Sequence, residues 1–319
     1  MSFVRSFLIA FVVALIVFVP IAYFTVNYVV EEVENGLAKT TEPSDENNGP
    51  AGDGYEIDAT GSLSLLLVVT SPDDGAGTGG AGQTAQKKVE FLTLVYYNCD
   101  SRQVVITALP GDTAIQLQGV SMSFSDGYNY MKSGTYEVSD RYIADSVTGY
   151  TGIPIDCYAY VDRADFERVA DEMGGLTVEF SEAFTVYDRT DGSNRFFPQG
   201  INQLSSADLH SLLVYEGYNS ASTKMQIISA VCKSVLDRES TTANYLRIES
   251  IWAKLYPMYY EYNLGEYDSV REFANKMFVY RLCTVNIVGV QGKYAEVGGE
   301  KLFVVDYNST ISLMKQYSR

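Results

Sequence analysis

Histidine and cysteine are the residue types that most often act in catalysis or bind transition metals, and this chain has few of them. The only histidine is His210, and no partner group stands at a spacing that would make it a general base. The four cysteines share no CxxC pair and lie far apart, at Cys99, Cys157, Cys232 and Cys283. The sequence therefore predicts no zinc site of the usual ligands, and His210 is expected to be solvated or simply hydrogen-bonded.

The cysteines lie in segments that suggest a structural role. Cys157 and Cys283 fall in strand-like runs and Cys232 on a predicted helix face, where free cysteine behaves as a small apolar residue. Buried thiols are the preferred interpretation, while an exported location leaves a disulfide open.

A glycine-rich stretch at residues 71–86, SPDDGAGTGGAGQTAQ, has the composition of a phosphate-binding loop. Such a loop needs a Lys-Ser or Lys-Thr pair, or GxGxxG at the start of a helix, and neither is present. We expect a flexible surface loop.

The charge balance excludes several classes of partner. The chain has 23 Lys and Arg against 40 Asp and Glu, a formal net charge of −17. Binding to nucleic acid or anionic lipid headgroups needs clustered basic residues, so neither is expected.

The N-terminal region predicts a membrane anchor. Residues 7–30 are nearly all apolar and long enough to cross a bilayer, with Arg5 before them and Glu31, Glu32 and Glu34 after. The positive-inside rule then places residues 1–6 in the cytoplasm and the rest outside. Residues 31–61 are acidic and poor in apolar side chains, which predicts a disordered tether before a folded domain at 62–319.

The folded domain reads as α/β, and its most informative stretch is residues 156–180. Residues 156–161 predict a strand and 163–173 a helix with Asp162 as N-cap, ended by Gly174-Gly175, before a second strand at 176–180. Further predicted strands cover 62–70, 89–98, 104–109, 285–290 and 302–305. Further predicted helices cover 141–150, 223–238, 242–256, 268–281, 311–317 and a segment starting at Ser205 or Ser206. Residues 122–139 and 185–200 show little periodicity.

The segment 152–184, GIPIDCYAYVDRADFERVADEMGGLTVEFSEAF, resembles the central segment of the LytR-CpsA-Psr (LCP) family at several fixed spacings. The resemblance implies a three-layer α/β/α extracytoplasmic domain with a mixed central sheet. Members of that family attach glycopolymers, carried on a polyprenyl pyrophosphate lipid, to the peptidoglycan of Gram-positive bacteria. The implied partners are the membrane, a polyprenyl lipid or a cell-wall glycan.

The resemblance also assigns site residues by position. It implies catalytic and Mg²⁺-binding roles for Asp73, Glu90 and Asp112. It implies ligand-binding roles for Lys88, Tyr215, Lys224 and Gln226. The family's three arginine positions, however, read Gly111, Val214 and Glu216 here.

Loss of these arginines bears directly on activity. Bidentate guanidinium groups hold phosphate oxygens with a geometry that lysine does not reproduce. The preferred hypothesis is a catalytically degenerate envelope protein that binds or scaffolds, for which no cofactor is assigned. An active divergent phosphotransferase or pyrophosphatase using Mg²⁺ is the alternative, and a lipid-binding pocket protein is a third. A guanidinium supplied from elsewhere, such as Arg102, Arg141, Arg189 or Arg195, would weaken the degenerate hypothesis.

Overall fold

The computed structural model describes residues 61–72, 86–133, 141–188, 192–215, 217–218, 220–239, 259–263 and 283–317. The predicted anchor at 7–30, the tether at 31–61 apart from Gly61, and the predicted helices at 242–256 and 268–281 lie outside these residues. Within the described part, no helix is both long and apolar enough to cross a membrane.

A six-stranded mixed sheet forms the centre of the described fold, in the order β11-β6-β1-β2-β3-β12. Strand β1 pairs antiparallel with β2 and parallel with β6, and β12 pairs parallel with β3. The predicted mixed sheet is thus confirmed. Its strands are β1 (Ser62–Pro72), β2 (Lys87–Asn98), β3 (Gln103–Pro110), β6 (Cys157–Asp162), β11 (Tyr259–Asn263) and β12 (Thr284–Ile287).

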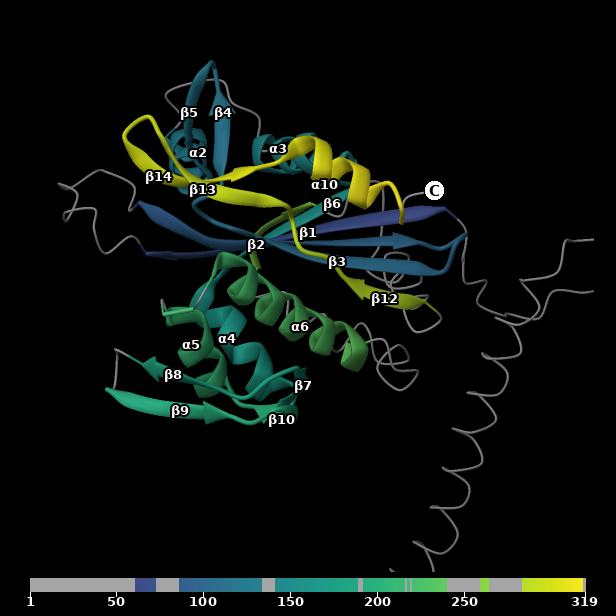
Figure 1. Ribbon diagram of the computed structural model, residues 1–319, viewed down its shortest axis with the longest axis vertical. Helices are drawn as coiled ribbons and strands as arrows, with labels where there is room; N and C mark the ends of the chain where they lie inside the picture. Colours follow the sequence, from purple (N-terminus) through teal and green to yellow (C-terminus); the bar gives the residue numbers. More distant parts are fainter. Residues whose placement is uncertain are drawn as a thin grey trace, which may run out of the picture. The chain divides into compact units, whose positions relative to one another are not determined.

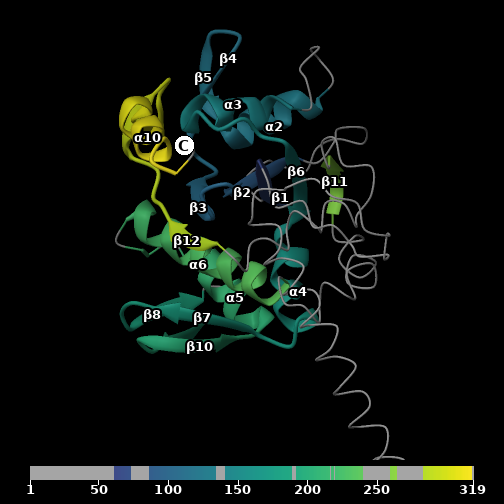
Figure 2. The same ribbon diagram turned by 90° about the vertical axis from the view of Figure 1, so that its right-hand side faces the viewer.

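Helices cover both faces of this sheet (Figures 1 and 2). One face carries α2 (Phe124–Lys132), α3 (Tyr142–Thr151) and α10 (Tyr307–Met314), and the other α4 (Arg163–Glu172), α5 (Ser206–Val214) and α6 (Ala221–Glu239). Strand β1 shows why two layers form, because its alternating side chains enter two separate cores. Leu63 and Val69 pack under α4 to α6, whereas Leu66 and Val68 pack toward α2 and α3.

In the described part of the chain, four two-stranded ribbons lie outside the central sheet. They are β4 (Ala114–Leu117) with β5 (Val120–Ser123), β7 (Leu176–Phe180) with β10 (Gly200–Leu204), β8 (Phe184–Asp188) with β9 (Ser193–Phe197), and β13 (Gly292–Val297) with β14 (Glu300–Val305). The strand predicted at 176–180 therefore forms, with the predicted alternation of burial, but it pairs with β10 and not with the central sheet.

The described parts of the two segments without evident periodicity form regular elements. Helix α2 begins at a capping box. The Ser123 side chain accepts a hydrogen bond from the Asp126 N–H, and the Asp126 side chain accepts one from the Ser123 N–H. Its buried residues Phe124, Tyr128 and Met131 follow the helical spacing. In 185–200, the hairpin β8–β9 packs Val186 and Phe197 into the core. The four cysteines are thiols and not disulfides, and Cys99, Cys157 and Cys232 are buried, as the preferred interpretation predicted, while Cys283 is partly buried.

Candidate functional site

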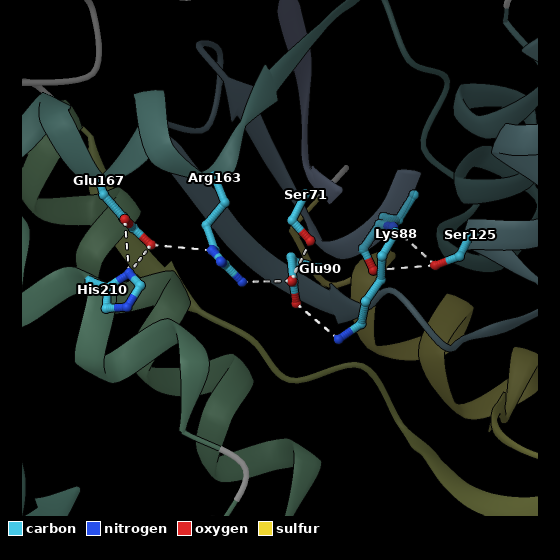
Figure 3. A network of polar contacts seen from close by, with 8 residues as sticks. Ser71, Lys88, Glu90, Ser125, Arg163, Glu167 and His210 are labelled. Carbon is cyan, nitrogen blue, oxygen red and sulfur yellow. Dashed lines mark hydrogen bonds and ion pairs between the residues drawn. The ribbon is translucent and has the colours of Figure 1, made fainter. Parts of the chain in front are cut away.

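The site forms where β1 and β3 end and β2 begins, and a bulge in β2 positions one of its acidic side chains. Val69 of β1 pairs with Phe91, but the next residue, Thr70, pairs with Val89, so Glu90 is the extra residue of β2. A bulge of this kind redirects a side chain at the end of a ladder. Helix α2 holds the bulged strand, since the Val89 N–H donates to Ser125 Oγ at 2.9 Å (Figure 3).

Glu90 lies nearly buried within a set of polar partners, with a side chain 8% exposed. One carboxylate oxygen accepts hydrogen bonds from Ser71 Oγ at 2.7 Å and from the Arg163 guanidinium at 3.0 Å. The other lies 3.3 Å from Lys88 Nζ. Burial alone would raise the pKa of Glu90, but Lys88, Ser71 and Arg163 together lower it below its ordinary value. Glu90 is therefore a carboxylate with its charge compensated inside the protein.

Arg163, the first residue of α4, joins Glu90 to a second carboxylate (Figure 3). Its Nε lies 3.3 Å from Glu167, and Glu167 contacts His210 Nδ1 at 3.0 Å. Burial raises the pKa of Glu167 despite these two partners. His210 is hydrogen-bonded, as predicted, although the sequence did not reveal its partner. Asp162 occupies the N-cap of α4 but does not cap it, since its carboxylate contacts Lys87 Nζ at 2.7 Å and Thr70 Oγ1 at 3.1 Å.

A cavity of about 700 Å³ opens beside the turn that follows β3. Asp112, Tyr215 and Lys224 line it, so the structure brings together three of the residues implied by the resemblance. Gln226 lines a neighbouring cavity of about 310 Å³ instead. Tyr215 and Tyr218 line both cavities and stack edge-to-face with centroids 4.8 Å apart. Glu90 and Lys88 line neither, and Asp73 and Glu216 lie outside the described residues.

The β13–β14 ribbon supplies cations that the sequence analysis did not anticipate. The Phe303 N–H donates to the Asp112 carbonyl at 3.0 Å, which seats the ribbon on the turn. Lys293 and Lys301 consequently line the same cavity as Lys224. Lys301 Nζ also lies 5.4 Å from the Tyr294 ring centroid. The basic side chains that line the cavity are therefore ammonium groups, which lack the planar fork of a guanidinium.

Gly111, where the resemblance implies an arginine, has no room for a side chain. The Gly111 N–H donates to the Glu90 carbonyl at 3.3 Å, which draws the turn against β2. A Cβ built on Gly111 would lie 1.6 Å from the Val89 carbonyl oxygen. Elsewhere in the domain, Arg141 pairs with Asp145 and Arg195 pairs with Asp208. Neither of these arginines lines the cavity, and Arg102 does not line it either. Arg189 lies outside the described residues.

Among the described residues, Asp112 is the acidic group on the cavity wall. Its carboxylate accepts a hydrogen bond from Tyr294 Oη at 3.3 Å. Burial raises the pKa of Asp112 above its ordinary value, and the Tyr294 hydrogen bond, Lys88 and Lys224 only partly offset this. Lys88 and Lys224 act electrostatically on Glu90 as well, so the two carboxylates share one electrostatic environment.

The raised pKa of Asp112 predicts a specific effect on stability. A carboxyl whose pKa is raised in the folded state contributes stability at low pH, and this contribution is lost as the pH rises through its folded pKa. Asp112→Asn removes the charge, so its Tm should exceed that of the wild type at pH 7. The difference should vanish below the ordinary Asp pKa of about 3.9. Thermal unfolding followed across this pH range checks the prediction, and a Tm difference of the same size at every pH would contradict it.

Comparison with known proteins agrees with this fold. Residues 23–216 match the model of the LytR_cpsA_psr family. The chain is 23% identical over 221 residues to the polyisoprenyl-teichoic acid–peptidoglycan teichoic acid transferase TagU of Halalkalibacterium halodurans, covering 67% of each sequence. It is 26% identical over 194 residues to the transferase TagV of Bacillus subtilis, covering 57% of this chain and 45% of TagV.

The fold comparison points the same way. The crystal structure of B. subtilis TagV superposes with a TM-score of 0.59 at 17% identity, covering 81% of this chain and 97% of that one. At 17% identity, the structural similarity establishes the fold alone. Membership of the family rests on the family model, which matches more than half of the sequence. The chain therefore belongs to the LytR-CpsA-Psr family, and it has that family's mixed-sheet α/β fold.

Proposed function

We propose that this chain is a membrane-anchored, extracytoplasmic cell-envelope protein that binds the phosphorylated end of a polyprenyl-linked glycopolymer precursor without transferring it. The binding site is the cavity beside Asp112. The observation that carries the proposal is that this cavity keeps three lysines while its neighbouring turn has no space for the family's arginine.

The lysines support the binding half of the proposal. Lys224, Lys293 and Lys301 come from two separate elements, α6 and the β13–β14 ribbon, and line one cavity. In a chain with a net charge of −17, such a grouping stands out against the overall acidity. Ammonium groups bind phosphate as point charges, which suits retention of a diphosphate in more than one orientation.

The absence of arginine at positions 111 and 214 supports the second part of the proposal, that the bound group is not transferred. Group transfer requires charge placed where it develops in the transition state, and one missing contact of this kind can cost several kcal/mol. Position 111 is glycine and position 214 is valine, at the end of α5. Lysines on a cavity wall raise affinity for substrate and transition state alike, and such uniform binding does not accelerate the chemical step.

The proposal predicts measurable binding of a short polyprenyl diphosphate. Calorimetric titration of the full chain in detergent with geranyl diphosphate should give saturable binding in EDTA. The combined change Lys224→Gln, Lys293→Gln and Lys301→Gln should weaken it about 100-fold, since each exposed charge contact is worth about 1 kcal/mol.

A matched control lies on the same helix as Lys224. Lys233 belongs to α6 but lines neither cavity and pairs with Asp237. Lys233→Gln should leave the affinity within about twofold of the wild type, because a distant exposed charge is screened by salt. Equal affinity of the triple variant and the wild type would overturn the assignment of the cavity.

An active divergent transferase is the second candidate, and Asp112 favours it. A carboxyl with a raised pKa on the wall of a cationic cavity has the properties of a general acid or base. If this candidate is right, the full chain should cleave a polyprenyl diphosphate, and alanine at Glu90 and Asp112 should abolish cleavage.

The membrane topology has a separate test. A phosphatase that is active only outside the cytoplasm can be fused to the C-terminus of the full chain. Deletion of residues 7–30 should abolish the phosphatase activity, and activity that survives the deletion would contradict the anchor.

A further inference from the structure

The Mg²⁺ implied by the family does not fit the residues around Glu90. We infer that Arg163 and Lys88 occupy the cation position at Glu90, so that this site compensates its carboxylate without a divalent metal. The inference rests on the proposed function for the identity of the site, but its test requires no phosphate ligand.

Both oxygens of Glu90 already have cationic partners. Arg163 donates to Oε1 at 3.0 Å, where Ser71 also donates, and Lys88 Nζ lies 3.3 Å from Oε2. Mg²⁺ requires near-octahedral oxygen ligands at about 2.0–2.1 Å. A metal ion at Glu90 would have to displace a guanidinium from a carboxylate that is only 8% exposed.

Arg163 is held in this position from its other side. Its Nε contacts Glu167, whose carboxylate is 12% exposed and also contacts His210. One guanidinium therefore lies between two nearly buried carboxylates (Figure 3). Moving it toward solvent to admit a metal would leave Glu167 with His210 alone, and an uncompensated buried charge is strongly unfavourable.

Among the described residues, the charges of the ion pairs at Glu90 and Glu167 balance without a metal. Glu90 and Glu167 contribute two negative charges, and Arg163 and Lys88 contribute two positive charges. The adjacent pair of Lys87 and Asp162 is neutral by itself. A divalent ion would add two positive charges to a balanced group.

The side chains available as metal ligands also argue against a divalent ion at Glu90. Among the described residues, no group of three His, Cys, Asp or Glu side chains could hold a metal ion. Asp112, the second implied ligand, lines the cavity, but Glu90 does not. Two of the three acids in the implied metal set thus do not line a common cavity, although Lys88 and Lys224 act electrostatically on both.

Titration of the full chain in detergent with Mn²⁺, followed by electron paramagnetic resonance, tests the inference. Mn²⁺ prefers the same oxygen ligands as Mg²⁺ and reports binding directly. The wild type and Glu90→Gln should show the same weak, non-saturating uptake. One saturable site per chain in the wild type, lost in Glu90→Gln, would overturn the inference.

A variant that lacks both Lys88 and Arg163 should gain Mn²⁺ binding if these two cations exclude the metal. Combined Lys88→Gln and Arg163→Gln should bind Mn²⁺ at least about tenfold more tightly than the wild type, and adding Glu90→Gln should abolish the gain. Arg168→Gln is the control, because Arg168 lies on the same helix with a side chain 60% exposed and pairs with Asp165. Uptake in a folded double variant that equals the wild type's would also contradict the inference, since the two cations would then not be what excludes the metal. Circular dichroism establishes folding, and the wild-type comparison with Glu90→Gln remains decisive if the double variant does not fold.

Discussion

Gly111→Ala should lower the free energy of unfolding by at least about 3 kcal/mol, at the upper end of the range for overpacked sites. The added Cβ would lie 1.6 Å from the Val89 carbonyl oxygen and 2.5 Å from the Val89 carbonyl carbon. Both are backbone atoms, so no side-chain rotation relieves the clash. Ser125 of α2 and Thr70 of β1 hold the Val89 backbone, and the Gly111 N–H is bonded to Glu90.

Gly149 provides the matched control for this prediction. It is an exposed residue within α3, and an added Cβ there meets nothing within 4 Å. Gly149→Ala should stabilise the protein by about 0.5–1 kcal/mol, because alanine favours the helix. Chemical denaturation of both variants makes the comparison. If Gly111→Ala unfolds within about 1 kcal/mol of the wild type, the turn has room for a side chain and the steric explanation for the missing arginine is wrong.

The same clash bears on reconstruction of a transferase. Gly111→Arg would place the family's residue at its position in the chain, yet it introduces the same Cβ against the Val89 carbonyl. We therefore expect this variant to lose stability and to gain no transfer activity.

Arg163→Met should lower the free energy of unfolding by about 3 kcal/mol, the lower end of the range for breaking a buried ion pair. The lower end applies because the Arg163 side chain is 28% exposed. Its removal leaves Glu90 and Glu167 without their common partner. Denaturant titration at pH 7 measures the loss.

The pH dependence of this loss has a definite sign. Lys88, Ser71 and Arg163 outweigh burial and lower the pKa of Glu90 in the folded protein. A carboxyl with a lowered folded pKa contributes stability above its ordinary pKa, and that contribution is lost as the pH falls through the folded value. The difference between the wild type and Arg163→Met should therefore be largest at neutral pH and shrink in acid.

Arg168→Met separates this effect from a general change of charge on α4. Arg168 forms an exposed pair with Asp165, and such pairs are worth less than about 1 kcal/mol. Equal losses for Arg163→Met and Arg168→Met would contradict the central role of Arg163.

The sheet could be predicted from sequence because its signals are local. Runs of apolar residues predicted β1, β2 and β3. The 3.6-residue spacing of apolar side chains, ended by Gly174-Gly175, predicted α4. Strand β7 shows the limit of such signals, because alternation predicts a strand but not its partner. Helix α2 had a readable signal, the Ser123–Asp126 capping box, within a glycine- and tyrosine-rich composition that obscured it.

The site was harder to predict because long-range contacts assemble it. Lys293 and Lys301 reach the cavity only because the β13–β14 ribbon bonds to the turn at Asp112, far away in sequence. The bulge that places Glu90 depends on the pairing register between β1 and β2. Arg163 contacts Glu90 because β6 lies beside β1 in the sheet and α4 begins where β6 ends. None of these contacts follows from residue spacing alone.

Phosphorus-31 NMR of the full chain in detergent, titrated with geranyl diphosphate in the presence of EDTA, tests the central claim most directly. It observes binding and cleavage of the diphosphate in the same sample. We predict that both diphosphate resonances broaden or shift saturably while no free phosphate signal appears. Accumulating monophosphate or inorganic phosphate, or resonances that change only after Mg²⁺ is added, would contradict the account.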